Sequence, residues 1–133
     1  MVGACVLLID KSNKILLQQR KDNQCWGLAG GAMEPGETLE RTASRELYEE
    51  TGIKANDLTF FRVFSGEDFY YQYPHGDEVY NVIAAYICTD FSGDLRMEES
   101  EVQDLKFFHL DEIPPNLNPP EAPIIYEYLH HFR

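Results

Sequence analysis

The sequence predicts an α/β fold, in which helices cover the faces of a mixed β-sheet. The first observation behind this prediction is a set of short apolar runs that are typical of strands. The second is a change to a helical period over residues 38–51, and the third is the absence of a regular strand–helix–strand repeat. The strand-like runs cover residues 4–9, 15–18, 58–64, 79–88 and 105–110.

Turn residues separate the first predicted strands. Polar residues 10–14 lie between the runs 4–9 and 15–18, which favours a β-hairpin. The segment Glu34–Glu37 has proline at its second position and glycine at its third, as a type II turn requires.

A helix is expected from Thr38 to Thr51, and Gly52 is a natural left-handed stop for it. The remaining elements are expected in the following order: a strand at 58–64, an aromatic loop or wide hairpin at 65–77, a strand at 79–88, a turn at 92–94, a strand at 105–110, a proline-rich extended segment at 114–123 and a helix at 124–132.

Length and composition favour one globular domain over residues 1–133, with 44% apolar and 13% aromatic residues. No apolar run approaches the ~20 residues of a membrane span, so no membrane partner is expected. The start MVGACVLLID lacks a basic segment and resembles a strand, not a signal peptide.

The net charge limits which ligands the protein is expected to bind, and the cysteines indicate the compartment. A formal net charge of −12 disfavours duplex nucleic acid, although divalent cations can bring phosphates to an acidic protein. The three cysteines, Cys5, Cys25 and Cys88, are odd in number and widely spaced. We expect buried free thiols in a reducing cytoplasm, with no zinc site or disulfide.

The predicted helix carries an unusual crowd of acids near its C-terminal end. At about 100° per residue, Glu46 and Glu50 fall within about 20° of Leu39, and Glu49 about 80° to one side. The core-facing stripe consists of Leu39, Ala43 and Leu47. Two of the three late glutamates are therefore expected at the interior edge of the helix.

Such crowding is unfavourable without a cation. Like charges three or four residues apart repel by a few tenths of a kcal/mol, acids in the last turn oppose the helix dipole by about 0.3–1 kcal/mol each, and partly buried carboxylates lose hydration. A divalent cation would reverse all three effects, and hard oxygen ligands suit Mg²⁺ or Mn²⁺. The alternative is a solvated acidic face, the usual explanation of a charge run.

The spacing in this segment resembles the Nudix box, GX5EX7REUXEEXGU, where U is aliphatic. Gly31, Glu37, Arg45-Glu46-Leu47, Glu49-Glu50 and Gly52-Ile53 fill every defined position. Trp26–Gly31 resembles the WGLPGG lead-in of the family, and Leu105–Pro114 resembles a strand and turn near its C-terminus. The resemblance covers most of the chain. Ala29 departs from it, because proline is common there; this change should loosen the loop and leave the chemistry in place.

A member of the Nudix (MutT-like) hydrolase family is expected to be an α/β/α sandwich. The resemblance also implies a divalent-cation-dependent hydrolase that cleaves a pyrophosphate bond in a nucleoside diphosphate linked to another moiety. Carried over by position, Glu46, Glu49 and Glu50 would hold Mg²⁺, or Mn²⁺, with help from the Gly31 carbonyl. Arg45 would orient these acids.

Other residues receive less definite roles. Glu37, at the positive end of the helix dipole, and Gly52 are expected to be mainly structural. The general base is expected to be a box glutamate, Glu49, or one of Glu98, Glu99 and Glu101; we favour Glu101, which would also bind the cation. A solvated acidic loop is the alternative for these last three.

Substrate contacts are expected from Arg20 and from rings in the segment 69–80. The candidate rings are Tyr71, Tyr73 and Tyr80, which could stack on a base. The alternatives are a surface arginine and rings that serve as core or as a homodimer contact. His75 is expected to be an ordinary loop residue.

The leading hypothesis is a cytoplasmic pyrophosphohydrolase of small-molecule nucleotides, such as ADP-ribose or a nucleotide sugar. The acidic charge weighs mildly against a 5′-triphosphorylated RNA end. A catalytically inactive Nudix-like module that senses a nucleotide is an alternative, for which a degraded box would be expected. A Ca²⁺-binding or structural acidic protein is a third; it would not need the Arg45 spacing. The box does not select the substrate, the number of metal ions or the oligomeric state.

Overall fold

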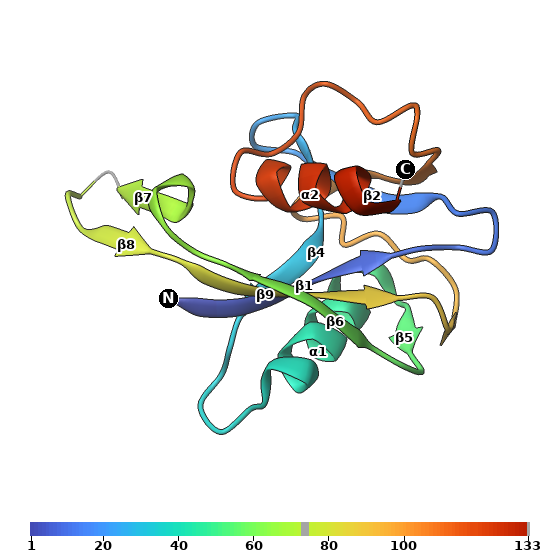
Figure 1. Ribbon diagram of the computed structural model, residues 1–133, viewed down its shortest axis with the longest axis horizontal. Helices are drawn as coiled ribbons and strands as arrows, with labels where there is room; N and C mark the ends of the chain where they lie inside the picture. The colour runs from blue at the N-terminus through green and yellow to red at the C-terminus, as the bar shows by residue number, and fades with distance from the viewer. Residues whose placement is uncertain (73–74, 133) are drawn as a thin grey trace.

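A computed structural model describes residues 1–72 and 75–132 (Figure 1). Its central element is a four-stranded mixed sheet in the order β4–β1–β9–β6. Strand β1 (Val2–Leu8) runs parallel to β9 (Val82–Cys88). Strand β4 (Ala29–Ala32) is antiparallel to β1, and β6 (Thr59–Phe64) is antiparallel to β9. The predicted mixture of parallel and antiparallel pairs is confirmed.

Three smaller sheets surround the central one. An antiparallel sheet has the order β11–β2–β3. Its strands are β11 (Val102–Phe108), β2 (Ile15–Arg20) and β3 (Trp26–Gly27). The other two sheets have two strands each. One joins β5 (Lys54–Ala55) to β10 (Phe91–Ser92), and the other joins β7 (Tyr70–Gln72) to β8 (Glu78–Tyr80). The short 3-10 helix η1 (Glu67–Phe69) comes directly before β7.

The two helices lie on opposite faces of the central sheet, α1 (Leu39–Thr51) below it and α2 (Ala122–Phe132) above it in Figure 1. Alternate residues of β1 serve the two cores. Leu7 packs in one buried cluster with Ile124 of α2, and Val6 packs in the other with Leu47 of α1. The expected α/β/α sandwich is confirmed. No helix in the described part of the chain has the length and apolar character that a membrane span requires.

The predicted hairpin between residues 4–9 and 15–18 is wrong. Strands β1 and β2 belong to different sheets and share only the bridge between Ile9 and Ile15. The residues between them still turn the chain, since the Asp10 carboxylate accepts the backbone N–H of Lys14 at 2.9 Å. The strands then diverge because β4 and β9 already occupy both edges of β1.

Most of the other expected elements are present, but one expected strand is divided in two. The predicted strand 79–88 is interrupted at Asn81, whose N–H donates to the Phe69 carbonyl at 2.9 Å, so it forms β8 and β9. Cys5 and Cys88 are buried free thiols as expected, whereas Cys25 is only half-buried.

Local signals place both ends of α1. The Glu37 N–H donates to the Glu34 carbonyl at 3.0 Å and Gly36 has φ of 83°, as a type II turn requires. The Thr38 hydroxyl then accepts the Arg41 N–H at 3.2 Å as an N-cap. At the other end Gly52 has φ of 79° and caps the helix in the left-handed conformation.

Replacing the stop glycine is expected to destabilise the fold more than replacing the turn glycine. Both have a positive φ, which costs an alanine about 1–2 kcal/mol. A Cβ on Gly52 would also lie 2.7 Å from the Asp94 carbonyl oxygen, whereas a Cβ on Gly36 meets nothing within 4 Å. We expect Gly36→Ala to lower the free energy of unfolding by about 1 kcal/mol and Gly52→Ala by about 3 kcal/mol in urea titrations. Equal losses would contradict the role of the contact with Asp94.

Candidate active site

Arg45 of α1 lies at the centre of an acidic cluster formed by the helix and the turn before it. Its Nε and Nη2 donate to the two carboxylate oxygens of Glu37 at 2.7 and 3.0 Å, a bidentate pair. Its Nη1 donates to Glu46 at 3.0 Å and to Glu49 at 3.3 Å, and lies 3.6 Å from Glu34. The pair with Glu37, and then the neighbouring Glu46, raise the pKa of Arg45 well above its ordinary value.

Glu37 joins the turn to the helix. Besides Arg45, its carboxylate accepts the backbone N–H of Glu34 at 2.9 Å and the Thr42 hydroxyl at 3.0 Å. These donors, Arg45 first, lower the pKa of Glu37 to about 2. The partners of its carboxylate in the described structure all belong to the turn or to α1, so its geometry is that of a structural anchor.

Glu46 and Glu50 turn toward the sheet, whereas Glu49 turns to solvent. The side chain of Glu46 is 17% exposed and that of Glu49 is 55% exposed. A Cβ on Gly31 would lie 2.5 Å from the Glu46 carboxylate, so this acid lies directly over the glycine. Glu50 accepts the Gln18 side-chain amide at 2.6 Å and the Gly30 N–H at 3.0 Å. Burial, and the charge of the adjacent Glu46, raise the pKa of Glu50 to about 8.

This donor set fits a hard divalent cation that is completed by other ligands. Among the described residues, no three His, Cys, Asp or Glu side chains are already arranged as a metal cage. Mg²⁺ does not need such a cage, since it is commonly held by one or two carboxylates together with waters and substrate phosphates. The two inward acids, Glu46 and Glu50, raise each other's electrostatic energy and would be relieved by a cation.

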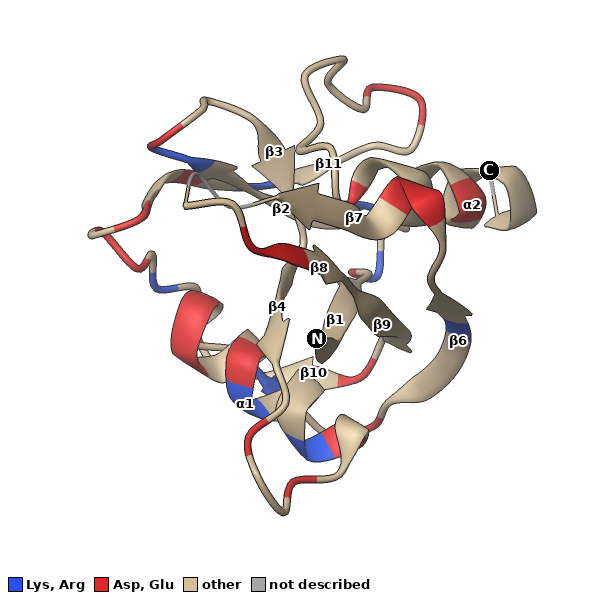
Figure 2. Cartoon of the chain, turned by 90° about the vertical axis from the view of Figure 1, so that its left-hand side faces the viewer, with Lys and Arg blue, Asp and Glu red and all other residues tan. Residues whose placement is uncertain are grey.

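The expected base, Glu101, lies in an exposed loop that two contacts hold. At one end Arg96 donates its backbone N–H to the Thr51 carbonyl at 2.7 Å, which fastens the loop to the end of α1. At the other end the Glu101 carbonyl accepts the Lys21 N–H at 2.9 Å. Figure 2 shows the acidic stretches of α1 and of the loop before β11 on the same side of the molecule. No hydrogen bond or ion pair joins the Glu101 carboxylate to the box glutamates in the described structure.

A cavity of 240 Å³ adjoins the cluster. Gly30 and Gly31 line it on one side, and Arg20, Asn118 and Glu121 provide polar groups elsewhere in its lining. The Asn118 amide donates to Glu121 at 2.7 Å, and burial raises the pKa of Glu121 to about 7. The cavity therefore combines an apolar wall with a few fixed polar groups, as ligand sites do.

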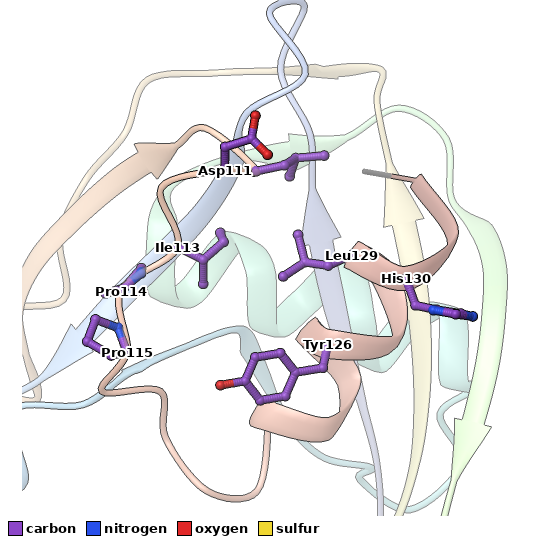
Figure 3. A pocket seen from close by; sticks show the side chains of 8 residues that line it. Asp111, Ile113, Pro114, Pro115, Tyr126, Leu129 and His130 are labelled. Carbon is purple, nitrogen blue, oxygen red and sulfur yellow. The ribbon is translucent and has the colours of Figure 1, made fainter.

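The predicted substrate residues divide between this cavity and the surface. Arg20 lines the cavity, where Asp22 holds its guanidinium at 2.7 Å. Tyr71 and Tyr80 lie on the exposed β7–β8 hairpin and are not part of the lining. Tyr73, the third predicted ring, lies outside the described residues. A separate cavity of 550 Å³ lies between α2 and residues 110–115 and shares no lining residue with the cluster (Figure 3).

Comparison with known proteins identifies the family. The model of the NUDIX domain matches residues 1–131. The chain belongs to the Nudix family. The MutT NUDIX hydrolase from Burkholderia pseudomallei has a similar structure, with a TM-score of 0.81 and 29% identity, over 99% of this chain and 97% of that chain.

Curated Nudix relatives have several named activities. An ADP-ribose pyrophosphatase from Methanocaldococcus jannaschii is 34% identical over 80% of this chain and 61% of its own length. An NAD-capped RNA hydrolase NudC from Chromobacterium violaceum is 30% identical over 85% of this chain and 40% of its own length. The chain thus spans less than two thirds of the length of either protein.

The Nudix box accounts for the acids on α1, but three other polar residues of the site were not predicted from the sequence. These are Gln18, Asn118 and Glu121. Gln18 occupies an inward position of β2, where the apolar pattern of residues 15–17 gives way to a polar residue. Glu121 precedes the apolar helix α2 and resembles an ordinary first-turn acid. The positions of all three follow from the meeting of segments that are distant in the sequence, so no local pattern could predict them.

The raised pKa of Glu121 makes stability depend on pH. Folding raises this pKa from its ordinary value of 4.5 to about 7, so the carboxyl favours folding below pH 4.5 and this contribution is lost as the pH rises to about 7. We expect Glu121→Gln to be more stable than the wild type at pH 8, by at most about 3 kcal/mol, and to lose most of that advantage at pH 4.5. Urea titrations at both pH values measure the difference.

The exposed acid Glu112 provides the control. Glu112→Gln removes a carboxyl from the same part of the chain without changing a buried group. A difference between Glu121→Gln and wild type that stays constant from pH 4.5 to pH 8 would contradict the raised pKa.

Proposed function

We propose that this Nudix protein hydrolyses a pyrophosphate bond in a nucleoside diphosphate linked to another moiety, with Mg²⁺, or Mn²⁺ in its place. The observation that carries the proposal is the wall shared by the acidic cluster and the 240 Å³ cavity. Gly31 lies under the Glu46 carboxylate and also lines the cavity, as does Gly30, whose N–H binds Glu50. A nucleotide with its nucleoside in the cavity would bring its phosphates to these acids.

The chain's own groups have distinct tasks in this reaction. Glu46 and Glu50, with Glu49 from the exposed side of the helix, would hold the cation, and the Gly31 carbonyl is a further candidate ligand. When bound, the cation would neutralise charge on the phosphoryl oxygens and lower the pKa of the attacking water. Arg45 would keep Glu46 and Glu49 in place through its ion pairs. Glu101, on its exposed loop, is the proposed base, with Glu49 the alternative.

The polar groups of the cavity would bind the nucleoside half. Arg20 lies in the lining with its guanidinium exposed on one side, where it can meet a phosphate. Asn118 and Glu121 offer hydrogen bonds deeper in the protein. ADP-ribose is a suitable first probe, because the Methanocaldococcus relative is named an ADP-ribose pyrophosphatase. The buried free thiols Cys5 and Cys88 favour a reducing compartment such as the cytoplasm.

A screen of nucleotides for hydrolysis tests the proposal. The panel includes ADP-ribose, a nucleotide sugar, a dinucleoside polyphosphate and nucleoside triphosphates, each with Mg²⁺, Mn²⁺ or EDTA. We expect metal-dependent release of a nucleoside monophosphate from at least one member, seen by chromatography. Tight binding of a nucleotide with no turnover under any condition would instead favour the sensing module.

Loss of one inward acid should remove the reaction. Glu50→Gln keeps the size of the side chain and the acceptor for Gly30, but removes the charge that the cation needs. We expect the metal-dependent rate to fall more than about 100-fold, because metal sites supply several kcal/mol of transition-state stabilisation.

The matched control is Glu40→Gln on the same helix. Glu40 accepts the Tyr86 hydroxyl at 2.6 Å and takes no part in the cluster, so this variant should keep the wild-type rate. A Glu50→Gln protein with unchanged turnover would refute the metal assignment. Circular dichroism checks that both variants are folded.

A further inference from the structure

Gln18 is a buried polar residue that has no role in the proposed reaction as described above. It lies on β2 and is 8% exposed. Its surroundings are largely apolar, since it lines a small void together with Val6, Leu16, Leu47 and Leu105. A leucine or methionine would suit these neighbours better, so packing alone does not explain the amide.

The amide holds one oxygen of Glu50. Gln18 Nε2 donates to Glu50 Oε1 at 2.6 Å, while the Gly30 N–H donates to Glu50 Oε2 at 3.0 Å. Each carboxylate oxygen thus has one donor, and the two donors come from different strands, β2 and β4. Two fixed donors restrict the carboxylate to one orientation and leave each oxygen a lone pair for a cation.

The other end of the amide is unsatisfied. Gln18 Oε1 is buried and receives no hydrogen bond from any described residue. In this orientation the amide nitrogen serves Glu50, and the amide oxygen is left without a donor. A buried acceptor without a donor destabilises the folded state. Gln18 therefore satisfies Glu50 at a cost to the fold.

The partners of Glu50 differ in charge from those of Glu37, which lies in the turn before the helix. Arg45 neutralises Glu37 through a bidentate ion pair. Gln18 and Gly30 are neutral donors, so they orient Glu50 without cancelling its charge. Glu50 therefore keeps its negative charge for a cation, whereas Glu46 and Glu49 share theirs with Arg45.

We propose that Gln18 is a positioning residue that presents the carboxylate of Glu50 to the divalent cation. The inference rests on the proposed metal-dependent function and deepens it. Outer partners of metal ligands typically contribute a factor of about 10–100 in metal affinity. Gln18 belongs to no defined position of the Nudix box, and its contact with Glu50 spans 32 residues of sequence.

The test measures metal binding directly. Gln18→Met preserves volume and removes the donor. The control is Gln19→Met, one residue along β2, where the side chain points to the other side and donates to the Gln24 carbonyl at 3.0 Å. Mn²⁺ binding is followed by electron paramagnetic resonance, and the melting temperature is recorded with EDTA and with increasing Mg²⁺ or Mn²⁺.

We expect Gln18→Met to bind Mn²⁺ about 10–100-fold more weakly than the wild type. The Mg²⁺ concentration for half-maximal turnover should rise by a similar factor, while turnover at saturating Mg²⁺ changes less. A purely structural role would lower the melting temperature in EDTA and leave the metal concentration dependence unchanged. The Gln19→Met protein should bind Mn²⁺ like the wild type.

The outcomes separate this inference from the function on which it rests. A wild type that binds no Mn²⁺ would refute the proposed metal site itself. Metal binding by the wild type with equal affinity in Gln18→Met would overturn only the role of Gln18. Gln18→Leu is a second variant; if neither variant folds while Gln19→Met does, Gln18 serves the core and the inference is also overturned.

Discussion

The rest of the site depends on the close approach of α1 to strand β4, where Gly31 has no side chain in the way. A Cβ on Gly31 would lie 2.5 Å from the Glu46 carboxylate, and one on Gly30 would lie 2.5 Å from the Ala4 carbonyl oxygen. Gly31 therefore lets the acidic face of the helix rest directly on the sheet, and Gly30 lets β4 lie close to β1. The same two glycines form the wall of the neighbouring cavity, which brings acids and cavity together.

The close packing places the negative charges of the glutamates where water cannot fully screen them. Some of these carboxylates are paired with Arg45, and one is held by neutral donors. Arg45 compensates Glu37, and its other nitrogens contact Glu46 and Glu49, so part of the cluster is held by ion pairs. Glu50 has only neutral donors among the described residues, and burial, with the adjacent Glu46, raises its pKa to about 8. The acidic cluster therefore keeps an excess of negative charge, which a divalent cation would neutralise.

Local structure was predictable where neighbouring residues decide it. The type II turn at Glu34–Glu37 and the stop at Gly52 each depend on a few adjacent residues, and both are present. Thr38, expected as the first residue of the helix, instead caps it. The hairpin between residues 4–9 and 15–18 failed for the opposite reason. The turn forms, but the pairing of β1 is decided by β9, about 80 residues away, which takes the edge that a hairpin would need (its register joins Val2 to Val82).

The sequence by itself determined the family, the helix and the set of acids on its inner face, because helical periodicity is a property of consecutive residues. Only the tertiary structure decided what those acids meet. Gln18 reaches Glu50 across 32 residues of sequence. Glu121, just before α2, lines the neighbouring cavity, whereas Tyr71 and Tyr80 are not part of its lining. Such meetings depend on how sheets and helices pack in space, and spacing along the chain carries no record of that packing.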